Sequence, residues 1–285
     1  MNDLSKQKDI PNSNSLSLGK SQGEALYIIK IGGNVIDNSE KLHHFLKDFA
    51  DLKGFKILVH GGGKMATNIA DEMHIEAKMI DGRRITDIET LRLVTMVYAG
   101  LINKNLVAQL QKYGCNAIGL SGADGNLIKA KKRLVETIDY GYVGDLDNNS
   151  IQTENLSKLI NNGFVPVFSA ITHDGDGQLL NTNADTIAAA LAIGTAKHYQ
   201  TSLVYCFDKK GVLMDIDDEN SVIKEINPLA YKDLKENGLI ADGMLPKLHN
   251  AFEAINKGVK EVFIGSADDL KELQNKGGFG TRLIK

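Results

Sequence analysis

The sequence is poor in cysteine, and its two cysteines form no motif. Cys115 and Cys206 stand far apart, and neither a C-x-x-C nor an H-E-x-x-H pattern occurs. None of the seven histidines has the spacing of a metal-ligand set. A disulfide framework and a zinc site are therefore not indicated, and both cysteines are expected to be buried free thiols in a reducing cytoplasm.

The sequence also lacks a block of one charge and a long apolar run. Its formal net charge is −3 and no basic cluster stands out, which argues against nucleic acid as a partner. The longest apolar stretch, around residues 187–193, is far shorter than the ~20 residues that a membrane span needs. We therefore expect a cytoplasmic protein that binds neither nucleic acid nor membrane, with its 285 residues in one large domain or two lobes.

Neither a Walker A motif nor G-x-G-x-x-G is present, so a P-loop and a Rossmann dinucleotide site are not indicated. What is present is an apolar run, 57–59, followed by His60, three glycines at 61–63, and a helical pattern that begins at Lys64. This order predicts a buried strand, a tight turn and a helix. Glycines let a ligand approach the backbone, and a helix N-terminus favours anions, so a phosphate site is one interpretation. The other is a turn that needs glycine for its conformation alone.

The remaining chain alternates between strand and helix patterns. Residues 1–24 are polar and rich in serine and asparagine, without the apolar core of a secretory signal, and predict a flexible tail or, alternatively, a short partner-binding helix. Further along, strands are predicted at 26–31, 117–120, 164–168, 202–207, 261–264 and 280–284, hairpins at 78–86 and within 129–150, and helices at 42–49, 88–112, 153–161, 186–192 and 242–258. Such alternation predicts a mainly parallel sheet with helices on both faces.

Two details of these elements leave alternatives open. The long helix 88–112 is apolar enough to serve the core and also a subunit interface. Pro166 cannot donate to a sheet ladder and is expected at a sheet edge or a strand end.

Several charged groups stand where apolar neighbours make them costly. Lys30 lies within an apolar strand just before a glycine turn, where it meets an anion or extends to solvent at a sheet edge. Arg83 and Arg84 are either solvated charges or a clamp for a carboxylate. Lys247 lies in the first turn of its helix, which is the unfavourable end for a cation unless it is solvated or meets a bound anion.

A polar cluster precedes the alanine-rich helix 186–192. A helix cap explains one of the residues Asn181, Asn183 and Asp185, but not three, so a ligand or a charge network is favoured. The turn Asp208–Leu213 follows the strand 202–207, at the carboxyl end where α/β sheets place ligands.

Taken together, the motifs resemble the N-acetylglutamate kinase family of the amino-acid kinase superfamily. The resemblance runs in unbroken order from about residue 25 to the C-terminus and leaves residues 1–24 outside. It is carried by K-I-G-G-N (30–34), V-H-G-G-G (59–63), G-R-R-I-T (82–86), N-K-N-L-V (103–107), G-L-S-G-A-D-G (119–125), N-T-N-A-D (181–185), D-K-K-G-V-L (208–213) and D-G-M-L-P-K (242–247).

The resemblance implies a three-layer α/β/α sandwich with a mainly parallel open sheet, in two lobes. Residues 25–180 would bind the acylglutamate and form a homodimer, and residues 181–285 would bind ATP. The implied reaction, the second step of arginine biosynthesis, is ATP-dependent phosphorylation of the γ-carboxylate of N-acetyl-L-glutamate. Mg²⁺ would be held mainly by the ATP phosphates. N-Succinyl-L-glutamate is the alternative substrate. The tail has too little apolar content for the helix that interlocks arginine-inhibited hexamers, which favours an uninhibited dimer.

Residue roles are carried over from the resemblance position by position. Lys30 would stabilise the transferring γ-phosphoryl group and Lys247 the leaving β-phosphate, with Asp185 hydrogen-bonded to both lysines. Gly62 and Gly63 would cradle the phosphoryl group and the reacting carboxylate, with Gly32, Gly33 and Gly61 around them. Arg84 and Asn181 would take the substrate's α-carboxylate. The adenine and ribose side would be formed by Asp208, Lys209, Lys210, Gly211, Val212 and Leu213, with Leu239, Ile240 and Ala241.

Two competing hypotheses remain. One is a kinase of the same superfamily for aspartate, glutamate, carbamate or UMP, against which the G-R-R-I-T and N-T-N-A-D segments argue. The other is a non-catalytic sensor of nucleotide or amino acid. Loss of a charged catalytic residue is typical of such a sensor, whereas Lys30, Asp185 and Lys247 are all present.

Overall fold

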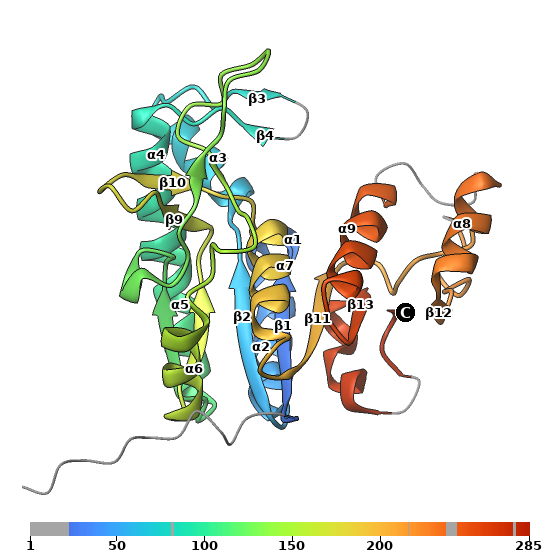
Figure 1. Ribbon diagram of the computed structural model, residues 1–285. Coiled ribbons are helices and arrows are strands. Elements are labelled where there is room, and N and C mark those ends of the chain that lie inside the picture. The colour runs from blue at the N-terminus through green and yellow to red at the C-terminus, as the bar shows by residue number, and fades with distance from the viewer. Residues whose placement is uncertain (1–22, 81–82, 216, 238–243, 276–277) are drawn as a thin grey trace, which may run out of the picture.

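A computed structural model describes residues 23–80, 83–215, 217–237, 244–275 and 278–285 (Figure 1). Nearly all of the predicted tail, residues 1–22, lies outside the described residues. So do Leu239, Ile240 and Ala241, three of the residues predicted to bind ATP.

The centre of the molecule is an eight-stranded sheet in the order β12-β14-β13-β11-β1-β2-β8-β5. Every neighbouring pair is parallel except β13 and β14, which confirms the predicted mainly parallel sheet. The strands are β1 (Ala25–Ile31), β2 (Phe55–His60), β5 (Ala117–Leu120), β8 (Val165–Phe168), β11 (Gln200–Phe207), β12 (Glu225–Ile226), β13 (Glu261–Ser266) and β14 (Thr281–Leu283).

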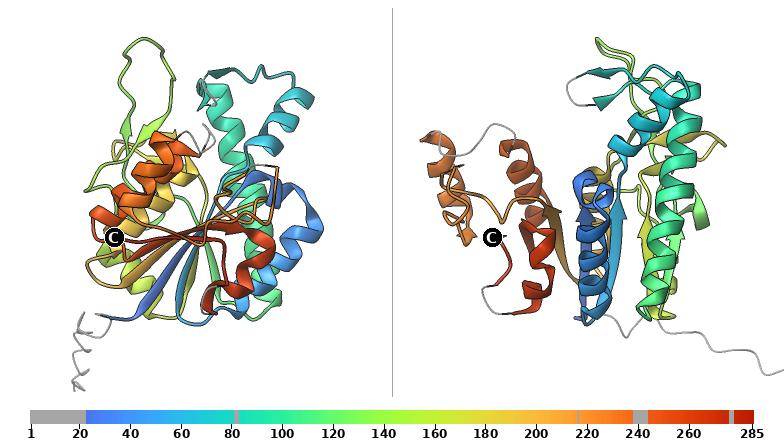
Figure 2. Two further views of the ribbon diagram at one scale, coloured as in Figure 1. Left: turned by 90° about the vertical axis from the view of Figure 1, so that its right-hand side faces the viewer. Right: turned by 180° about the vertical axis from the view of Figure 1, so that it is seen from behind.

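Helices cover both faces of the sheet and make the three layers (Figure 2). One layer holds α2 against α1, α5 and the 3₁₀ segment η4, and the opposite layer holds α7 and α9, with α7 packed on β1, β2 and β11. The helices are α1 (Gly33–Asp37), α2 (Ser39–Asp51), α3 (Gly63–Glu72), α4 (Ile88–Val94), α5 (Asn103–Lys112), α6 (Thr153–Asn161), α7 (Ala184–Thr195), α8 (Pro228–Glu236) and α9 (Leu245–Asn256), with η3 (Asp124–Asn126) and η4 (Ala267–Gln274) in 3₁₀ form.

The long helix predicted at 88–112 has the expected ends but not a uniform interior. Its middle, Thr95–Ile102, is a π-helix (η2) between α4 and α5. A π-helix is wider than an α-helix and is common at functional sites. This one places Tyr98 and Ile102 beneath the three-glycine turn, as described below.

Pro166 lies near the start of β8, which is one of the two places predicted for it. Because β8 is an interior strand between β2 and β5, the other predicted place, a sheet edge, is excluded. The missing N–H is tolerated because the pairing of β8 with β2 begins only at Val167.

Three short two-stranded hairpins lie outside the eight-stranded sheet. They pair β3 (Met79–Ile80) with β4 (Arg83–Arg84), β6 (Lys131–Lys132) with β7 (Gly144–Asp145), and β9 (Ile171–His173) with β10 (Leu179–Asn181). The first two confirm the hairpins predicted at 78–86 and within 129–150. Both cysteines are buried free thiols, as predicted. None of the helices in the described part of the chain has the length and apolar character needed to cross a bilayer.

Candidate active site

Three neighbouring parallel strands end side by side, and the turns that follow their carboxyl ends contain several of the predicted site residues. Strand β1 lies between β2 and β11, and Ile31 is in register with both His60 and Cys206. The turns that follow these strands are therefore adjacent, although they are far apart in the sequence. The first glycine turn is tied to β11 by a hydrogen bond from the Gly32 amide to the Cys206 carbonyl, 3.1 Å long.

Lys30 and Asp185 form an ion pair at the carboxyl ends of these strands. Lys30 Nζ lies 2.8 Å from Asp185 Oδ1, and the lysine side chain is only 11% exposed. Asp185 stands in the first turn of α7, whose N-terminal cap is Asn183 accepting from the Thr186 amide. Since β1 is an interior strand, a lysine that reaches solvent at a sheet edge is excluded, and the anion beside Lys30 is Asp185.

Lys247 lies in the first turn of α9, as predicted, and its ammonium group lies near Lys30 and Asp185. Its Nζ lies 3.9 Å from the centroid of the Phe207 ring. Burial lowers the pKa of Lys247; Asp185 opposes this shift and Lys30 adds to it. The ion pairs of the described residues include Lys30 with Asp185 but not Lys247 with Asp185. The expected bond between Asp185 and Lys247 therefore stays a prediction.

The second glycine turn needs glycine at its centre. Gly62 has φ +149°, and a Cβ there would stand 2.2 Å from Ile102 Cδ1 and 3.1 Å from Tyr98 Cδ1. Gly62 is also the N-cap of α3, which begins at Gly63 without a side-chain cap. The first amides of a ten-residue helix thus face the turn, an arrangement that suits an anion. The conformational interpretation of the glycines is confirmed at Gly62, and the phosphate site stays a prediction.

A buried histidine holds the start of this turn. His60 is fully buried, and burial lowers its pKa to about 4, so its ring is neutral near pH 7. Nδ1 donates to the Gly61 carbonyl (2.8 Å), which leaves Nε2 to accept from the Asn103 amide (3.0 Å). The Asn103 amide also donates to the Val167 carbonyl, and Lys104 donates to the Asn103 carbonyl oxygen. This network joins the glycine turn to α5 and β8.

The neutral His60 predicts a pH-dependent stability. Between pH 6.5 and about 4 the unfolded chain protonates this histidine while the folded protein does not, so the free energy of unfolding falls as the pH is lowered. From pH 7 to pH 5 the loss from this residue is about 2 kcal/mol. Urea unfolding of the wild type and of His60→Gln at both pH values measures it. The loss should be smaller in His60→Gln by about that amount, and equal losses would contradict the prediction.

The two neighbouring arginines separate in the structure. Arg83 is exposed, whereas Arg84 is buried, and its Nη2 donates to the Gly63 carbonyl (3.0 Å) and to Thr67 Oγ1 (2.7 Å). Its Nη1 is buried and has no hydrogen-bond partner. An unpaired guanidinium N–H is costly and fits an anionic ligand that supplies the missing acceptor. The guanidinium thus joins the β4 hairpin to the first turn of α3.

Asn181 lies at the end of β10, and its side chain faces the β4 hairpin. Its Nδ2 donates to Thr86 Oγ1 (3.0 Å), and Thr86 Oγ1 donates to the Arg84 carbonyl (3.2 Å). The three polar residues at 181–185 have separate partners: Thr86 for Asn181, the Thr186 amide of α7 for Asn183 and Lys30 for Asp185. A helix cap thus accounts for Asn183 alone, as predicted, and Asp185 belongs to an ion pair.

The turn after β11 contains the described residues predicted to bind ATP. Asp208 accepts from Asn34 Nδ2 (2.6 Å) and pairs with Lys41 (3.5 Å), so it links this turn to α1 and α2. Gly211 and Val212 pack against Thr281, which accepts from the Val212 amide. Lys209 pairs with Glu219 at 3.7 Å, Lys210 is exposed, and Leu213 bridges to Val222.

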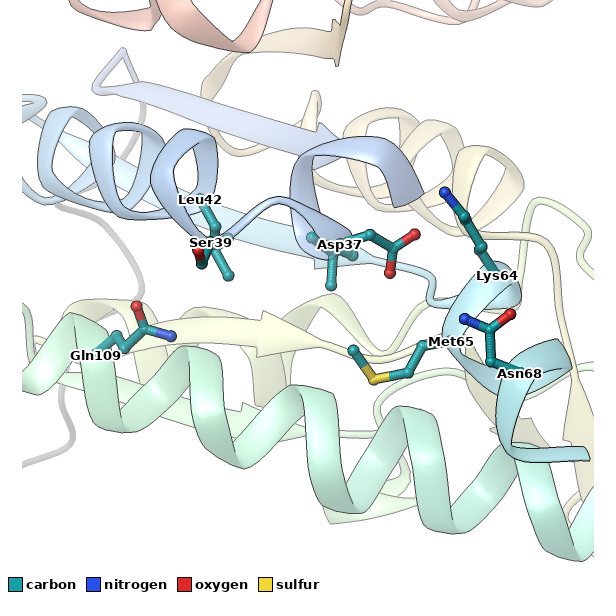
Figure 3. A pocket seen from close by; sticks show the side chains of 8 residues that line it. Asp37, Ser39, Leu42, Lys64, Met65, Asn68 and Gln109 are labelled. Carbon is teal, nitrogen blue, oxygen red and sulfur yellow. The ribbon is translucent and has the colours of Figure 1, made fainter. Parts of the chain in front are cut away.

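A cavity of about 420 Å³ lies beside the glycine turns, between the helices that follow them (Figure 3). Asp37 of α1 and Lys64 of α3 are on its wall, with Ser39, Asn68 and Gln109. Burial raises the pKa of Asp37, and Lys64 opposes this shift. The cavity is separate from the Lys30–Asp185 pair, and no residue predicted for the site lines it.

Three groups at the site were missed as individual residues. Asn103 belongs to the N-K-N-L-V segment and carries only the weak signal of a polar residue within an apolar helix. His60 carried the signal of a histidine at a strand end. Phe207 carried none, because an aromatic residue that ends a strand is typical of the core.

Comparisons with known proteins agree with this architecture. The sequence profile described as "Amino acid kinase family" matches residues 25–266. The chain is 56% identical over 263 residues to the acetylglutamate kinase of Cytophaga hutchinsonii, which covers 92% of this chain and 99% of that protein. It is 51% identical over 261 residues to the acetylglutamate kinase of Parabacteroides distasonis, covering 92% of this chain and all (100%) of that protein. The crystal structure of smu.665 from Streptococcus mutans superposes with a TM-score of 0.71 and 26% identity, over 91% of this chain and 98% of that one.

Proposed function

Because the chain belongs to the amino acid kinase family, we propose that it transfers the γ-phosphoryl group of ATP to the γ-carboxylate of N-acetyl-L-glutamate. The products are N-acetylglutamyl 5-phosphate and ADP. The activity is that of the acetylglutamate kinases to which it is 50–56% identical, and it belongs to arginine biosynthesis. N-Succinyl-L-glutamate, the alternative raised by the sequence, has no support among these relatives.

The observation that carries the proposal is the convergence of two lysines, one carboxylate and two glycine turns at the carboxyl ends of β1, β2 and β11. A carboxylate oxygen of the substrate would attack the γ-phosphorus, and the bond from that phosphorus to the oxygen bridging to the β-phosphate would break. The γ-carboxylate is already ionised at pH 7, so no general base is required. The protein then supplies position and positive potential to the phosphoryl oxygens.

The residues take separate parts in this transfer. Lys30, held by Asp185, would meet the transferring phosphoryl group, and Lys247 would meet the leaving β-phosphate. Gly32 and Gly33 on one side, and Gly61, Gly62 and Gly63 on the other, would cradle the phosphoryl group and the reacting carboxylate. This division places one cation on each side of the bond that breaks.

Mg²⁺ would accompany the nucleotide, whose phosphates would supply most of its ligands. In the described ranges, no group of three or more His, Cys, Asp or Glu could hold a metal ion. The carboxylate closest to the lysines, Asp185, is paired with Lys30. Bound in this way, the ion would neutralise phosphate charge, and the lysines would act on the oxygens that remain.

The test is ATP turnover by the purified protein with MgATP and either N-acetyl-L-glutamate or N-succinyl-L-glutamate, with hydroxylamine to trap the acyl phosphate. Turnover with N-acetyl-L-glutamate is expected. Turnover with N-succinyl-L-glutamate alone would change the substrate. Turnover with neither, in folded protein that binds ATP, would refute the proposal and leave the other amino-acid kinases and then a non-catalytic sensor.

Arg84 would bind the α-carboxylate of the amino-acid substrate, together with Asn181. Arg84→Ala is therefore expected to raise KM for the acylglutamate about 10- to 100-fold, since a hydrogen bond to a charged group contributes about 1.5–3 kcal/mol. KM for ATP should change little. Arg83→Ala is the matched control, because this neighbour is exposed, and it should leave both constants near the wild type. An effect of Arg84→Ala confined to ATP would contradict the pose.

A homodimer would form through the π-helix η2. Met96 and Leu101 on this helix are 55% and 47% exposed, and burial of such side chains is favourable. Sedimentation is expected to give twice the 31.0 kDa chain mass. Met96→Glu with Leu101→Glu should yield monomer, whereas Leu229→Glu on α8, at a residue 75% exposed, should not. A wild-type monomer would contradict this assembly.

A further inference from the structure

The ring of Phe207 has both lysines of the site close to it. Its centroid lies 5.4 Å from Lys30 Nζ and 3.9 Å from Lys247 Nζ. A cation within about 6 Å of an aromatic centroid is attracted by the ring quadrupole, and more strongly where water is excluded. Lys30 is 11% exposed and Lys247 is half-buried, so both contacts are partly desolvated. One aromatic ring thus serves two ammonium groups.

The sheet fixes the position of this ring. Phe207 is the last residue of β11 and is in register with Ser266 of β13. It stacks on Tyr205, with centroids 6.1 Å apart and planes at 17°, as residues two apart on one strand face do. Tyr205 is in register with Lys30, which places Lys30 next to it on the neighbouring strand. Gly32 also lies against the ring, since a Cβ added at this glycine would be 3.8 Å from Phe207 Cδ1.

The site has a charge imbalance that this ring offsets. Two ammonium groups share one carboxylate, and Asp185 forms its ion pair with Lys30. Lys247 is repelled by Lys30 and loses hydration by burial, while Asp185 attracts it. Tyr205 is also against Asp185: its hydroxyl donates to the Asp185 backbone carbonyl (3.4 Å) and is neutral, since burial raises its pKa. The face of Phe207 is the close partner that Lys247 has in the described structure.

We propose that Phe207 is a positioning residue, which holds the Lys247 ammonium on its face beside Lys30 so that both cations are in place when the phosphates of the nucleotide arrive. The proposal rests on the function proposed above, because it assigns Phe207 a part in that transfer. Phe207 acts through the two lysines and needs no contact with the reacting atoms. Its contribution depends on the ring face, and not only on the volume of the side chain.

The test compares Phe207→Leu, which removes the ring face, with Phe207→Tyr, which keeps it. In Phe207→Leu, kcat should fall about tenfold, the size expected for a partly desolvated cation–π contact. The alkaline limb of the kcat–pH profile should move to lower pH, because the ring favours the charged form of Lys247. In Phe207→Tyr, kcat should stay within about twofold and the limb should not move. Equal losses in the two variants without a shift of the limb would reduce Phe207 to a space-filling role and overturn the proposal.

A second measurement does not depend on turnover. In nucleotide-free protein with ¹³Cε-labelled lysine, the Lys247 signal is assigned by its absence in Lys247→Arg. Phe207→Leu should remove the ring-current shift of this signal and lower its titration midpoint, and Phe207→Tyr should do neither. An unchanged Lys247 signal in folded Phe207→Leu would overturn the proposal. Absence of kinase activity in the wild type would instead refute the proposed function, so the two failures are distinguishable.

Discussion

Replacement of Lys30 by alanine is expected to lower kcat by about 10²–10³-fold, which corresponds to about 2.7–4 kcal/mol for the loss of one preorganised group. The transition state of phosphoryl transfer spreads negative charge over the phosphoryl oxygens, and catalysis consists mainly of position and positive potential. Lys30 is held in advance by Asp185 at 2.8 Å, on an interior strand, so it needs no reorganisation when the substrate binds. KM for ATP should change much less than kcat.

Two controls make this result specific. Lys30→Ala leaves the Asp185 carboxylate without its cation, so part of any loss could come from a disturbed site. Lys30→Ala with Asp185→Asn removes both charges and should be no more active than the single variant. Lys232→Ala, on the exposed face of α8, should keep full activity. Folded Lys30→Ala with near-normal kcat would show that the assigned role is wrong.

The parts of the fold that sequence predicts well are the local ones. The apolar run 57–59 predicts a buried strand, the three glycines predict a turn, and the periodic residues after Lys64 predict a helix. Each of these elements depends on residues that are close together in the sequence. The ends of α6 and the helical stop near Gly258, which has φ +105°, are local in the same sense.

The parts that sequence leaves open depend on strands that meet from distant positions. Nothing near Arg83 and Arg84 says which one is buried, since the answer lies in Thr67 and Gly63 of α3. The order of strands places β11 beside β1, and only this neighbourhood brings Phe207 to Lys30. Lys30, Asp185 and Lys247 lie close together, but the roles carried over from the family resemblance stay predictions, and the close partner of Lys247 is a ring that no motif contains.

The π-helix is a second case of this kind. The pattern at 88–112 predicts one apolar helix, and its α-helical periodicity gives no sign of a wider turn. The structure places Tyr98 and Ile102 of this segment under Gly62, where the turn and the helix have to fit each other. The requirement for glycine at 62 is thus set by residues almost forty positions further along the chain, and not by the turn alone.

Gly62→Ala is expected to destabilise the folded protein and to remove most of its activity. Alanine is strained at φ +149°, which costs about 1–3 kcal/mol. Its Cβ would also stand 2.2 Å from Ile102 Cδ1, and overpacking of this kind costs about 1–3 kcal/mol more. The free energy of unfolding should therefore fall by about 2–6 kcal/mol in urea titrations. Since the turn also carries the first amides of α3, kcat should fall at least about 10²-fold in the molecules that remain folded.

Gly33→Ala separates the two causes. A Cβ at Gly33 meets nothing within 4 Å, and Gly33 is not among the glycines with positive φ, so stability should stay within about 1 kcal/mol of the wild type. Its activity should still fall, because the methyl group would occupy the space proposed for the phosphoryl group. Loss of stability in both variants would mean that the two turns are built for conformation alone. If stability falls only in Gly62→Ala while activity falls in both variants, glycine is needed for the backbone conformation at position 62 and for the approach of the ligand at both positions.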